Sequence, residues 1–386
     1  MIKDGKRKQI ICYILVVLVP LILRVGYLCL NGIVKSPDSY SYIRMANNII
    51  AQGPVYYIHN LDAPYYWGYP TYLAIMFFLI GDNFFVICLV QTVLACASMI
   101  FLFKALNRLI REQWVCLCMV FLYTIIFDVM MWDRYVLTEC LGMTIEAICF
   151  YFFINLITAD EISKKDFILF AVFCILFFLA RSNAITIVFA MGIVIVSRLD
   201  RKVRNKILLG FIVVMCGLVS MIIASSIMHP DNVNLIDTIE VATKGIREGN
   251  VIDERHEYDI LLPSEGFRLP FYALVILKRM VMYWSIFIRA YSKAHKLMCI
   301  VGILPTYVLA FLSTFRAFKE KIRTYIELFV VIVLSSLIQI VVFIDYDFRY
   351  RAPIFIPLIL LGSLSGKYIG DMILKKLKEL KLSNDN

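Results

Sequence analysis

The stretch Asp345-Tyr-Asp-Phe-Arg349-Tyr350-Arg351-Ala-Pro353-Ile-Phe-Ile-Pro357 sets two arginines directly before a long apolar segment. Ionisable side chains at membrane depth are costly, and in membrane proteins they usually mark a pathway or a site. A segment of about 20 apolar residues is long enough to cross a bilayer as a helix. We therefore expect a membrane-spanning helix over 352–370, with charged groups where it meets the membrane surface.

The composition of the whole chain indicates the same class. Of its 386 residues, 61% are hydrophobic and 18% are charged, whereas soluble domains average about 45–50% apolar and about 25% charged residues. The sequence therefore predicts an all-α polytopic membrane protein with about ten transmembrane helices. The expected spans are 10–32, 84–103, 114–131, 136–158, 166–180, 184–197, 207–228, 297–315, 325–344 and 352–370, of which 166–180 and 184–197 are short and form a hairpin.

Lysine and arginine are distributed unevenly between the loops. If the N-terminus is cytoplasmic, the short inner segments hold 23 of these residues and the short outer segments hold 6. Because cytoplasmic loops carry the excess of positive charge, we expect both termini in the cytoplasm of a multi-pass cell-membrane protein. The apolar stretches 72–81 and 271–290 are expected at the outer surface, since crossing there would export basic loops. The first apolar segment lacks a small-residue cleavage site and is expected to be a retained span.

These spans divide the chain into three parts. Residues 1–228 form a transmembrane module with a first outer loop at 35–69, residues 229–296 an outer loop with interfacial helices, and residues 297–386 the last transmembrane helices and a basic cytoplasmic tail. The net charge of +10 comes from basic loops between spans, so no nucleic-acid partner is expected. Most cysteines lie in apolar segments, where they act as small hydrophobes, and His59, His229, His256 and His295 show no ligand spacing. No metal ligand is assigned.

The first outer loop carries the first candidate site residue, Asp38. Ser36 followed by Pro37 is a helix start signal, and apolar residues then recur at helical spacing until Gly53-Pro54. The pattern predicts an amphipathic helix on the outer membrane surface with Asp38 in its first turn. Two roles remain open for Asp38: it complements the helix dipole, or it acts on a substrate.

Aromatic residues follow in the same loop, in the run Ala63-Pro64-Tyr65-Tyr66-Trp67-Gly68-Tyr69-Pro70. Tyrosine and tryptophan gather at membrane interfaces because their rings are amphipathic. The same rings can stack on a sugar. Both interpretations stay open for Tyr65, Tyr66, Trp67 and Tyr69.

Two further elements are expected on the same face. Glu139, in Leu137-Thr138-Glu139, lies just inside the membrane, where an acidic side chain does not face lipid; it pairs with Arg134 or Arg181, or it belongs to a site. Arg349 and Arg351 either anchor the following helix by snorkelling or bind an anion, for which the guanidinium fork is well shaped.

Taken in order, these elements resemble the polytopic GT-C glycosyltransferases, and most of all the branch of protein O-mannosyltransferases and lipid A aminoarabinose transferases. The matching residues are Asp38, Tyr42, Ala46 and Gly53; Gly68-Tyr69-Pro70; Leu137-Thr138-Glu139; Leu179-Ala180-Arg181; and Arg349-Tyr350-Arg351-Ala-Pro353. The likeness covers roughly 9–230 and 325–370. Many relatives carry two adjacent acidic residues in the first loop, whereas Asp38 is followed by Ser39, so Glu139 or Asp133 would have to supply the second acidic group.

The resemblance implies a GT-C fold and a polyprenyl-phosphate sugar as donor, attacked at the extracytoplasmic face by a hydroxyl of a glycan, lipid or protein acceptor. Asp38 and Glu139 would be catalytic, and Arg349, Arg351 and Arg181 would bind the donor phosphate. Tyr42, Tyr65, Tyr66, Trp67, Tyr69 and Tyr350 would line the sugar or the interface. The resemblance assigns no certain cofactor and implies no nucleotide-sugar site; whether Glu139 assists Asp38 or holds a divalent cation stays open. The alternatives are a transporter or flippase of lipid-linked sugars and a non-catalytic envelope assembly protein.

Overall fold

A computed structural model describes residues 2–60, 64–161, 163–199, 269–288, 291–342 and 348–384, and the regular elements in these residues are helices. This confirms the predicted all-helical class. The helices are α1 (Ile2–Asn31), α2 (Pro37–Gln52), α3 (Val55–His59), η1 (Pro64–Tyr66), α4 (Gly68–Ile80), α5 (Phe84–Ile110), α6 (Gln113–Ile125), α7 (Phe127–Met130), η2 (Met131–Arg134), α8 (Thr138–Thr158), α9 (Lys164–Ala180), α10 (Ala184–Arg198), α13 (Leu269–Tyr283), α14 (Lys293–Glu320), α15 (Arg323–Val342), η4 (Ala352–Ile354) and α16 (Phe355–Asn384).

Within the described residues, six helices are long and apolar enough to cross a membrane, and a seventh span is counted if a bent pair forms one. The six are α1, α5, α8, α14, α15 and α16. The expected number of about ten is therefore not reached in this part of the chain. The helices α9 and α10 are shorter than these six, and the predicted span 207–228 lies outside the described residues. A multi-pass membrane protein is the class that these long apolar helices support.

The apolar helices differ in how deeply they are buried. In α8 and in α16, 72% of the most apolar window is buried inside the protein, against 22% in α1. A helix that is hydrophobic on all sides is stable only where every side is covered by protein or lipid. Helices α8 and α16 therefore form the centre of the bundle, and α1 lies at its edge with one side left for lipid.

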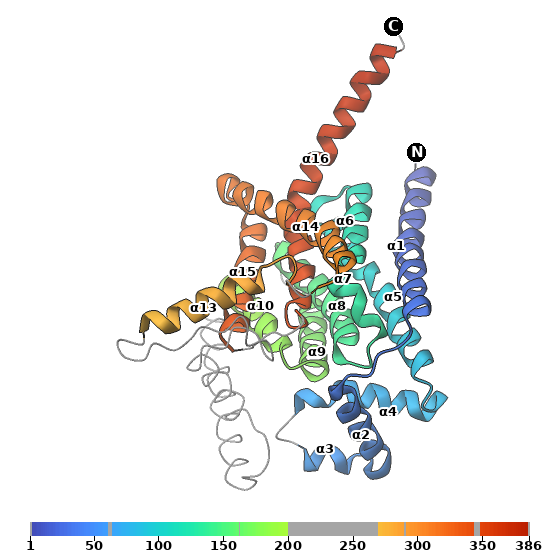
Figure 1. Ribbon diagram of the computed structural model, residues 1–386. Coiled ribbons are helices and arrows are strands. Elements are labelled where there is room, and N and C mark those ends of the chain that lie inside the picture. Colours follow the sequence, from blue (N-terminus) through green and yellow to red (C-terminus); the bar gives the residue numbers. More distant parts are fainter. Residues whose placement is uncertain are drawn as a thin grey trace.

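The first loop forms a separate layer at one end of the bundle. Figure 1 shows α2, α3 and α4 gathered beyond the end of α1 that lies away from the N-terminus. Helix α2 begins after Ser36, whose backbone N–H donates to Ser39 Oγ at 2.9 Å, and it ends at Gly53, where φ is +59°. Helix α4 ends in the same way at Gly81, with φ +70°. Both segments that were expected to form helices at the membrane surface are therefore helical.

The third expected span, 114–131, is not continuous. Helix α6 ends at Ile125, and α7 with η2 continues to Arg134 after a bend of 67°. Helix α14 packs against this break through Gly302, because a Cβ at that position would lie 2.8 Å from Cα of Ile126. Only glycine allows two backbones to approach so closely. The bend places Asp128, the second residue of α7, beside α14.

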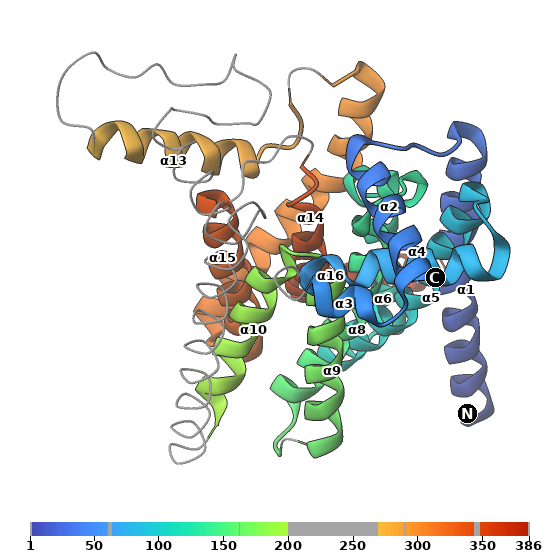
Figure 2. The same ribbon diagram turned by 90° about the horizontal axis from the view of Figure 1, so that it is seen from below.

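The termini and α13 complete the architecture. Both ends of the chain lie at the end of the molecule opposite to α2–α4 (Figure 1). Figure 2, seen from below, shows α13 lying crosswise to α15, which it contacts. Within the described residues α13 is 15 residues long, fewer than the roughly 20 residues that a span needs; the outer position expected for 271–290 stays a prediction.

Candidate functional site

Four charged side chains that lie far apart in the sequence meet at the end of the bundle that faces α2. Arg349 Nη1 donates to Asp38 Oδ2 at 2.7 Å, and Arg349 Nε lies 2.8 Å from Glu139 Oε1. Arg181 Nη2 lies 3.5 Å from the same Glu139 oxygen. Two arginines therefore share one carboxylate, and one of them reaches a second. We call Asp38, Glu139, Arg181 and Arg349 the charged cluster.

The helix packing around Glu139 explains how this carboxylate comes to lie between two arginines. Glu139 is in the first turn of α8 and is fully buried. Gly142, one turn later, gives room to the Arg181 side chain, since a Cβ there would lie 3.1 Å from Arg181 Cδ. Of the two expected partners of Glu139, the structure pairs it with Arg181, whereas Arg134 donates to the carbonyl of Asn31.

The turn between α9 and α10 holds the segment before α16. Arg181 Nη2 donates to the backbone carbonyl of Arg349, and Asn183 Nδ2 donates to that of Tyr350 at 3.2 Å. Gly68, at the start of α4, packs on the last residues of α9 just before this turn, because a Cβ there would lie 2.6 Å from the carbonyl oxygen of Leu179. The cluster is thus fixed by backbone contacts as well as by ion pairs.

Burial decreases from Glu139 towards Asp38. The Glu139 side chain is fully buried, that of Arg349 is 21% exposed and that of Asp38 is 50% exposed. Burial acts to lower the pKa of Arg349, but the Glu139 carboxylate and the hydrogen bond to Asp38 outweigh it and raise that pKa above its ordinary value. Arg349 therefore stays cationic, and its pair with Asp38 is the one that solvent or a ligand can reach.

The predicted aromatic residues divide into two groups. The ring of Tyr42 lies 6.3 Å from that of Tyr66 and 5.4 Å from that of Tyr69. Burial and then the Glu139 carboxylate raise the pKa of Tyr42, and burial and then Asp38 raise that of Tyr66. These two tyrosines therefore border the charged cluster as neutral phenols.

The other aromatic residues predicted for the site are Tyr65, Trp67, Tyr69 and Tyr350, and each makes a different contact. Trp67 donates its indole N–H to the carbonyl of Asn60 at 3.0 Å. Tyr69 is fully buried, with its hydroxyl 3.4 Å from Gln91 Oε1. Tyr65 packs against Tyr66 at 4.6 Å, and the Tyr350 ring lies 5.5 Å from the Arg349 guanidinium.

Arg351 does not join the charged cluster. Its guanidinium is fully buried, pairs with Asp128 Oδ2 at 2.5 Å and donates to the carbonyls of Tyr283 and Ser285. Arg349 and Arg351 were expected to bind one phosphate together, but in the structure their guanidinium groups contact different carboxylates. Sequence reasoning missed Asp128 because it lies within an apolar stretch that reads as one continuous span.

Two more buried acidic residues lie near the centre of the bundle. Asp133, the other residue considered for a second acidic role, pairs with Arg24 at 3.3 Å and is fully buried. Glu146 follows Glu139 by two helical turns and is also fully buried, and its carboxylate oxygens have no hydrogen-bond partner among the described residues. Glu146 could have been identified from the sequence, because it follows Glu139 by seven residues and so lies on the same face of that helix.

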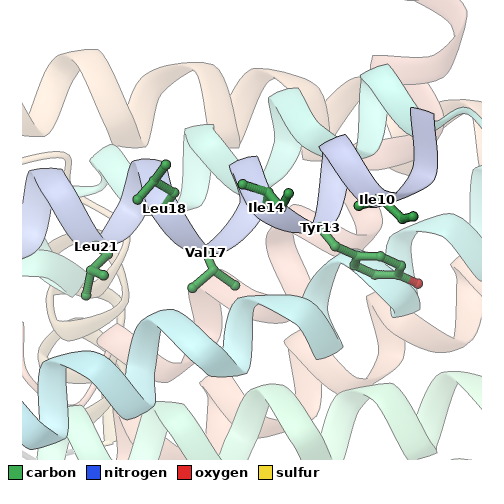
Figure 3. A pocket seen from close by; sticks show the side chains of 6 residues that line it. All are labelled: Ile10, Tyr13, Ile14, Val17, Leu18 and Leu21. Atoms are coloured by element: carbon green, nitrogen blue, oxygen red, sulfur yellow. The ribbon is translucent and has the colours of Figure 1, made fainter. Parts of the chain in front are cut away.

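A hollow on the surface of α1 is unrelated to these charged groups. Figure 3 shows that it runs along a single helix, and its lining consists of apolar side chains with one tyrosine: Ile10, Tyr13, Ile14, Val17, Leu18 and Leu21. A stripe of this kind on an edge helix is what a lipid-facing surface requires. It offers no group for chemistry.

The chain matches no protein-family model, no curated protein and no solved structure. Two neighbouring guanidinium groups can bind an anion such as a phosphate when that anion displaces a carboxylate from them. A half-exposed carboxylate beside them can accept a proton from a hydroxyl group.

Proposed function

We propose that this chain is a membrane glycosyltransferase of the GT-C type, which transfers a sugar from a polyprenyl-phosphate donor to an acceptor hydroxyl at the extracytoplasmic face. The observation that carries the proposal is that Arg349 contacts both Asp38 and Glu139, at 2.7 and 2.8 Å. The residues that resemble the family lie in distant parts of the sequence, and four of them form this one cluster. The proposal includes the GT-C fold with further spans beyond those described and an outer position for α2–α4.

The donor phosphate is expected to take the place of Asp38 on Arg349. Asp38 is half exposed, so its ion pair is weak by comparison with a buried one and opens without loss of packing. Arg181 and Glu139 stay in place behind Arg349. A guanidinium held by a buried carboxylate is oriented before the ligand arrives, and such pre-organised groups are the main source of electrostatic stabilisation.

The released Asp38 carboxylate then faces the acceptor. An acceptor hydroxyl oxygen attacks the anomeric carbon of the sugar, the bond from that carbon to the phosphate oxygen breaks, and the hydroxyl proton passes to Asp38. The leaving group is the polyprenyl phosphate, whose added negative charge is stabilised by Arg349 and Arg181. The neutral hydroxyls of Tyr42 and Tyr66 border this space and suit hydrogen bonding to a sugar.

The proposal predicts that Asp38→Asn abolishes transfer, because general-base catalysis contributes about 10²–10⁴-fold. The test compares polyprenyl-phosphate sugars by mass spectrometry in cells that carry the native chain, the Asp38→Asn variant or no copy. The expected result is that one glycolipid accumulates in the variant and in the deletion strain. The matched control is Asp166→Asn, since Asp166 is also an acidic residue in the first turn of a helix. Equal glycolipid levels in all strains, with normal protein levels, would contradict transferase chemistry.

A second variant tests the phosphate role of Arg349. Lysine keeps the charge but loses the bidentate fork. A lost hydrogen bond to a charged group costs about 1.5–3 kcal/mol, so Arg349→Lys is expected to reduce turnover by at least about tenfold. Arg316→Lys is the control, because Arg316 forms an exposed pair with Glu320 on one helix. Wild-type turnover in Arg349→Lys would mean that Arg349 only anchors the segment before α16.

One observation favours a second candidate function, the transport of a lipid-linked sugar. Transporters commonly place their sites at broken helices, and α6 and α7 are bent by 67° with Asp128 just past the break. A transporter would change the side of the membrane on which the glycolipid resides and leave its attached sugar unchanged. Measuring the glycolipid separately in the two leaflets distinguishes this function from transfer.

A further inference from the structure

Three side chains of different chemistry meet where α14 crosses the broken helix. Asp128, His295 and Cys299 each offer a ligand atom, and these atoms lie within 4.8 Å of one another. We propose that they bind a divalent transition-metal ion, with zinc as the first choice. A carboxylate oxygen, an imidazole nitrogen and a thiolate sulfur are the three donor types that Zn²⁺ accepts. This site is separate from the charged cluster and does not depend on the proposed function.

The backbone fixes all three positions. His295 and Cys299 are four residues apart in α14, so they lie on the same face of that helix. Ser292 caps α14, and its Oγ accepts a hydrogen bond from the backbone N–H of His295 at 3.2 Å. Gly302, one turn after Cys299, allows α14 to touch the break at Ile126. These contacts bring Asp128 to the face that carries His295 and Cys299.

The spacing between the thiol and the carboxylate suits a tetrahedral ion. Cys299 Sγ lies 3.5 Å from Asp128 Oδ1. A sulfur about 2.3 Å and an oxygen about 2.0 Å from one tetrahedral zinc ion are about 3.5 Å apart. A thiol hydrogen bond to the carboxylate would give the same distance, but it leaves His295 without a role.

The His295 side chain supplies an independent observation. Its Nε2 atom is buried, and no hydrogen-bond partner reaches it from the residues that the structure describes. The ring is held by stacking on Tyr291 at 3.7 Å and by the edge contact with Phe127 at 4.5 Å. A buried nitrogen without a partner is costly, and a metal ion beside the ring would satisfy it.

Arg351 completes the surroundings of the site. It binds Asp128 through Oδ2 at 2.5 Å, which leaves Oδ1 directed at Cys299. Ligating carboxylates are commonly held in this way by a hydrogen-bond donor that does not touch the metal. A divalent ion, one thiolate, one carboxylate and Arg351 sum to one positive charge, so the fourth position suits water or an anion.

The test uses the purified full chain in detergent, stripped with a chelator and titrated with Co²⁺. The expected result is about one cobalt ion bound per chain, with a thiolate-to-cobalt charge-transfer band that added Zn²⁺ removes. Cys299→Ser and His295→Gln are expected to lose this band. Cys118→Ser and His59→Gln are the controls: Cys118 is an exposed cysteine on α6, and His59 is at the end of α3.

The absence of a band, or a band that persists in Cys299→Ser, would overturn the proposal. A second readout guards against variants that fail to fold. Zn²⁺ is expected to raise the melting temperature of the native chain and of the two controls, because a ligand of the folded state stabilises it. Equal shifts in Cys299→Ser and the native chain would equally reject the site. Neither readout involves a sugar or a lipid, so failure here is distinct from failure of the proposed function.

Discussion

At the residue scale, Asp38 and Glu139 share Arg349 but differ in what surrounds them. Glu139 is fully buried between Arg349 and Arg181, whereas Asp38 is half exposed and has the single arginine. The same change, carboxylate to amide, therefore has different consequences at the two positions. Comparing the amide variants at Asp38 and Glu139 therefore separates an effect on stability from an effect on chemistry.

We predict that Glu139→Gln destabilises the protein by about 3–5 kcal/mol, because it leaves the buried Arg181 guanidinium without its carboxylate and removes one of the two carboxylates that Arg349 contacts. Asp38→Asn is expected to cost at most about 1 kcal/mol, as for exposed pairs. The measurement is the apparent melting temperature in detergent, followed by tryptophan fluorescence. A larger decrease for Asp38→Asn than for Glu139→Gln would contradict this account.

Individual site residues could be predicted from the sequence where a local signal existed. Asp38 was predicted in a helix start, and Arg181 was one of two expected partners of Glu139. Arg351 was grouped with Arg349 because they are two residues apart, but the turn between them directs the two side chains to different carboxylates. Asp128 and the pair His295 and Cys299 come together only through the crossing of α14 with the broken helix, which local sequence does not encode.

At the scale of elements, the contact between α14 and the α6–α7 break depends on a single glycine. A Cβ at Gly302 would lie 2.8 Å from Ile126 Cα and 3.0 Å from the Ile125 carbonyl oxygen. Backbone atoms cannot move aside as a flexible side chain can. Alanine at this position must therefore push α14 away from the break.

We predict that Gly302→Ala lowers stability by about 1–3 kcal/mol, the usual cost of overpacking. The control is Gly192→Ala in α10, where a Cβ would meet nothing within 4 Å. That change is expected to be neutral or to stabilise by up to about 1 kcal/mol, since alanine is the better helix former. Both are measured by denaturant unfolding in detergent. Equal stability of the two variants would show that the close contact is not required.

Helices with strong end signals were predicted well, and the break was not. Ser36, Pro37 and Gly53 define α2 through local hydrogen bonding and backbone freedom. The bend at Ile126 has neither proline nor glycine in the chain around it, so the stretch was expected to continue as one span. At the bend, another helix, α14, packs closely against the chain through Gly302.

At the scale of the whole molecule, both termini lie at one end of the bundle and α2–α4 at the other (Figure 1). We predict that cysteines appended at the two ends react with an impermeant maleimide from one side of the membrane only. A cysteine replacing Tyr40, which is 63% exposed on α2, is expected to react from the opposite side. The unmodified chain supplies the background from its own cysteines. Reaction of all three from one side would contradict this arrangement.

The class of the molecule followed from composition, but the number of spans did not. An excess of apolar residues predicts that membrane helices are present, but it does not determine their number or arrangement. Whether a short apolar segment such as 166–180 or 184–197 crosses depends on tilt and on neighbouring helices, which one sequence does not reveal.

In the proposed function, a substrate anion takes the place of Asp38 on Arg349, so the charged cluster would exchange one anion for another. Two carboxylates and two guanidinium groups sum to no net charge, so an anion that displaces Asp38 into solvent leaves the interior neutral only if it carries one charge. A monoanionic phosphodiester meets this condition, whereas a dianionic phosphate monoester leaves one excess negative charge in a poorly solvated place. In the proposed reaction, the cluster would thus bind the phosphodiester donor better than the phosphate monoester product, and this difference would assist release of the product.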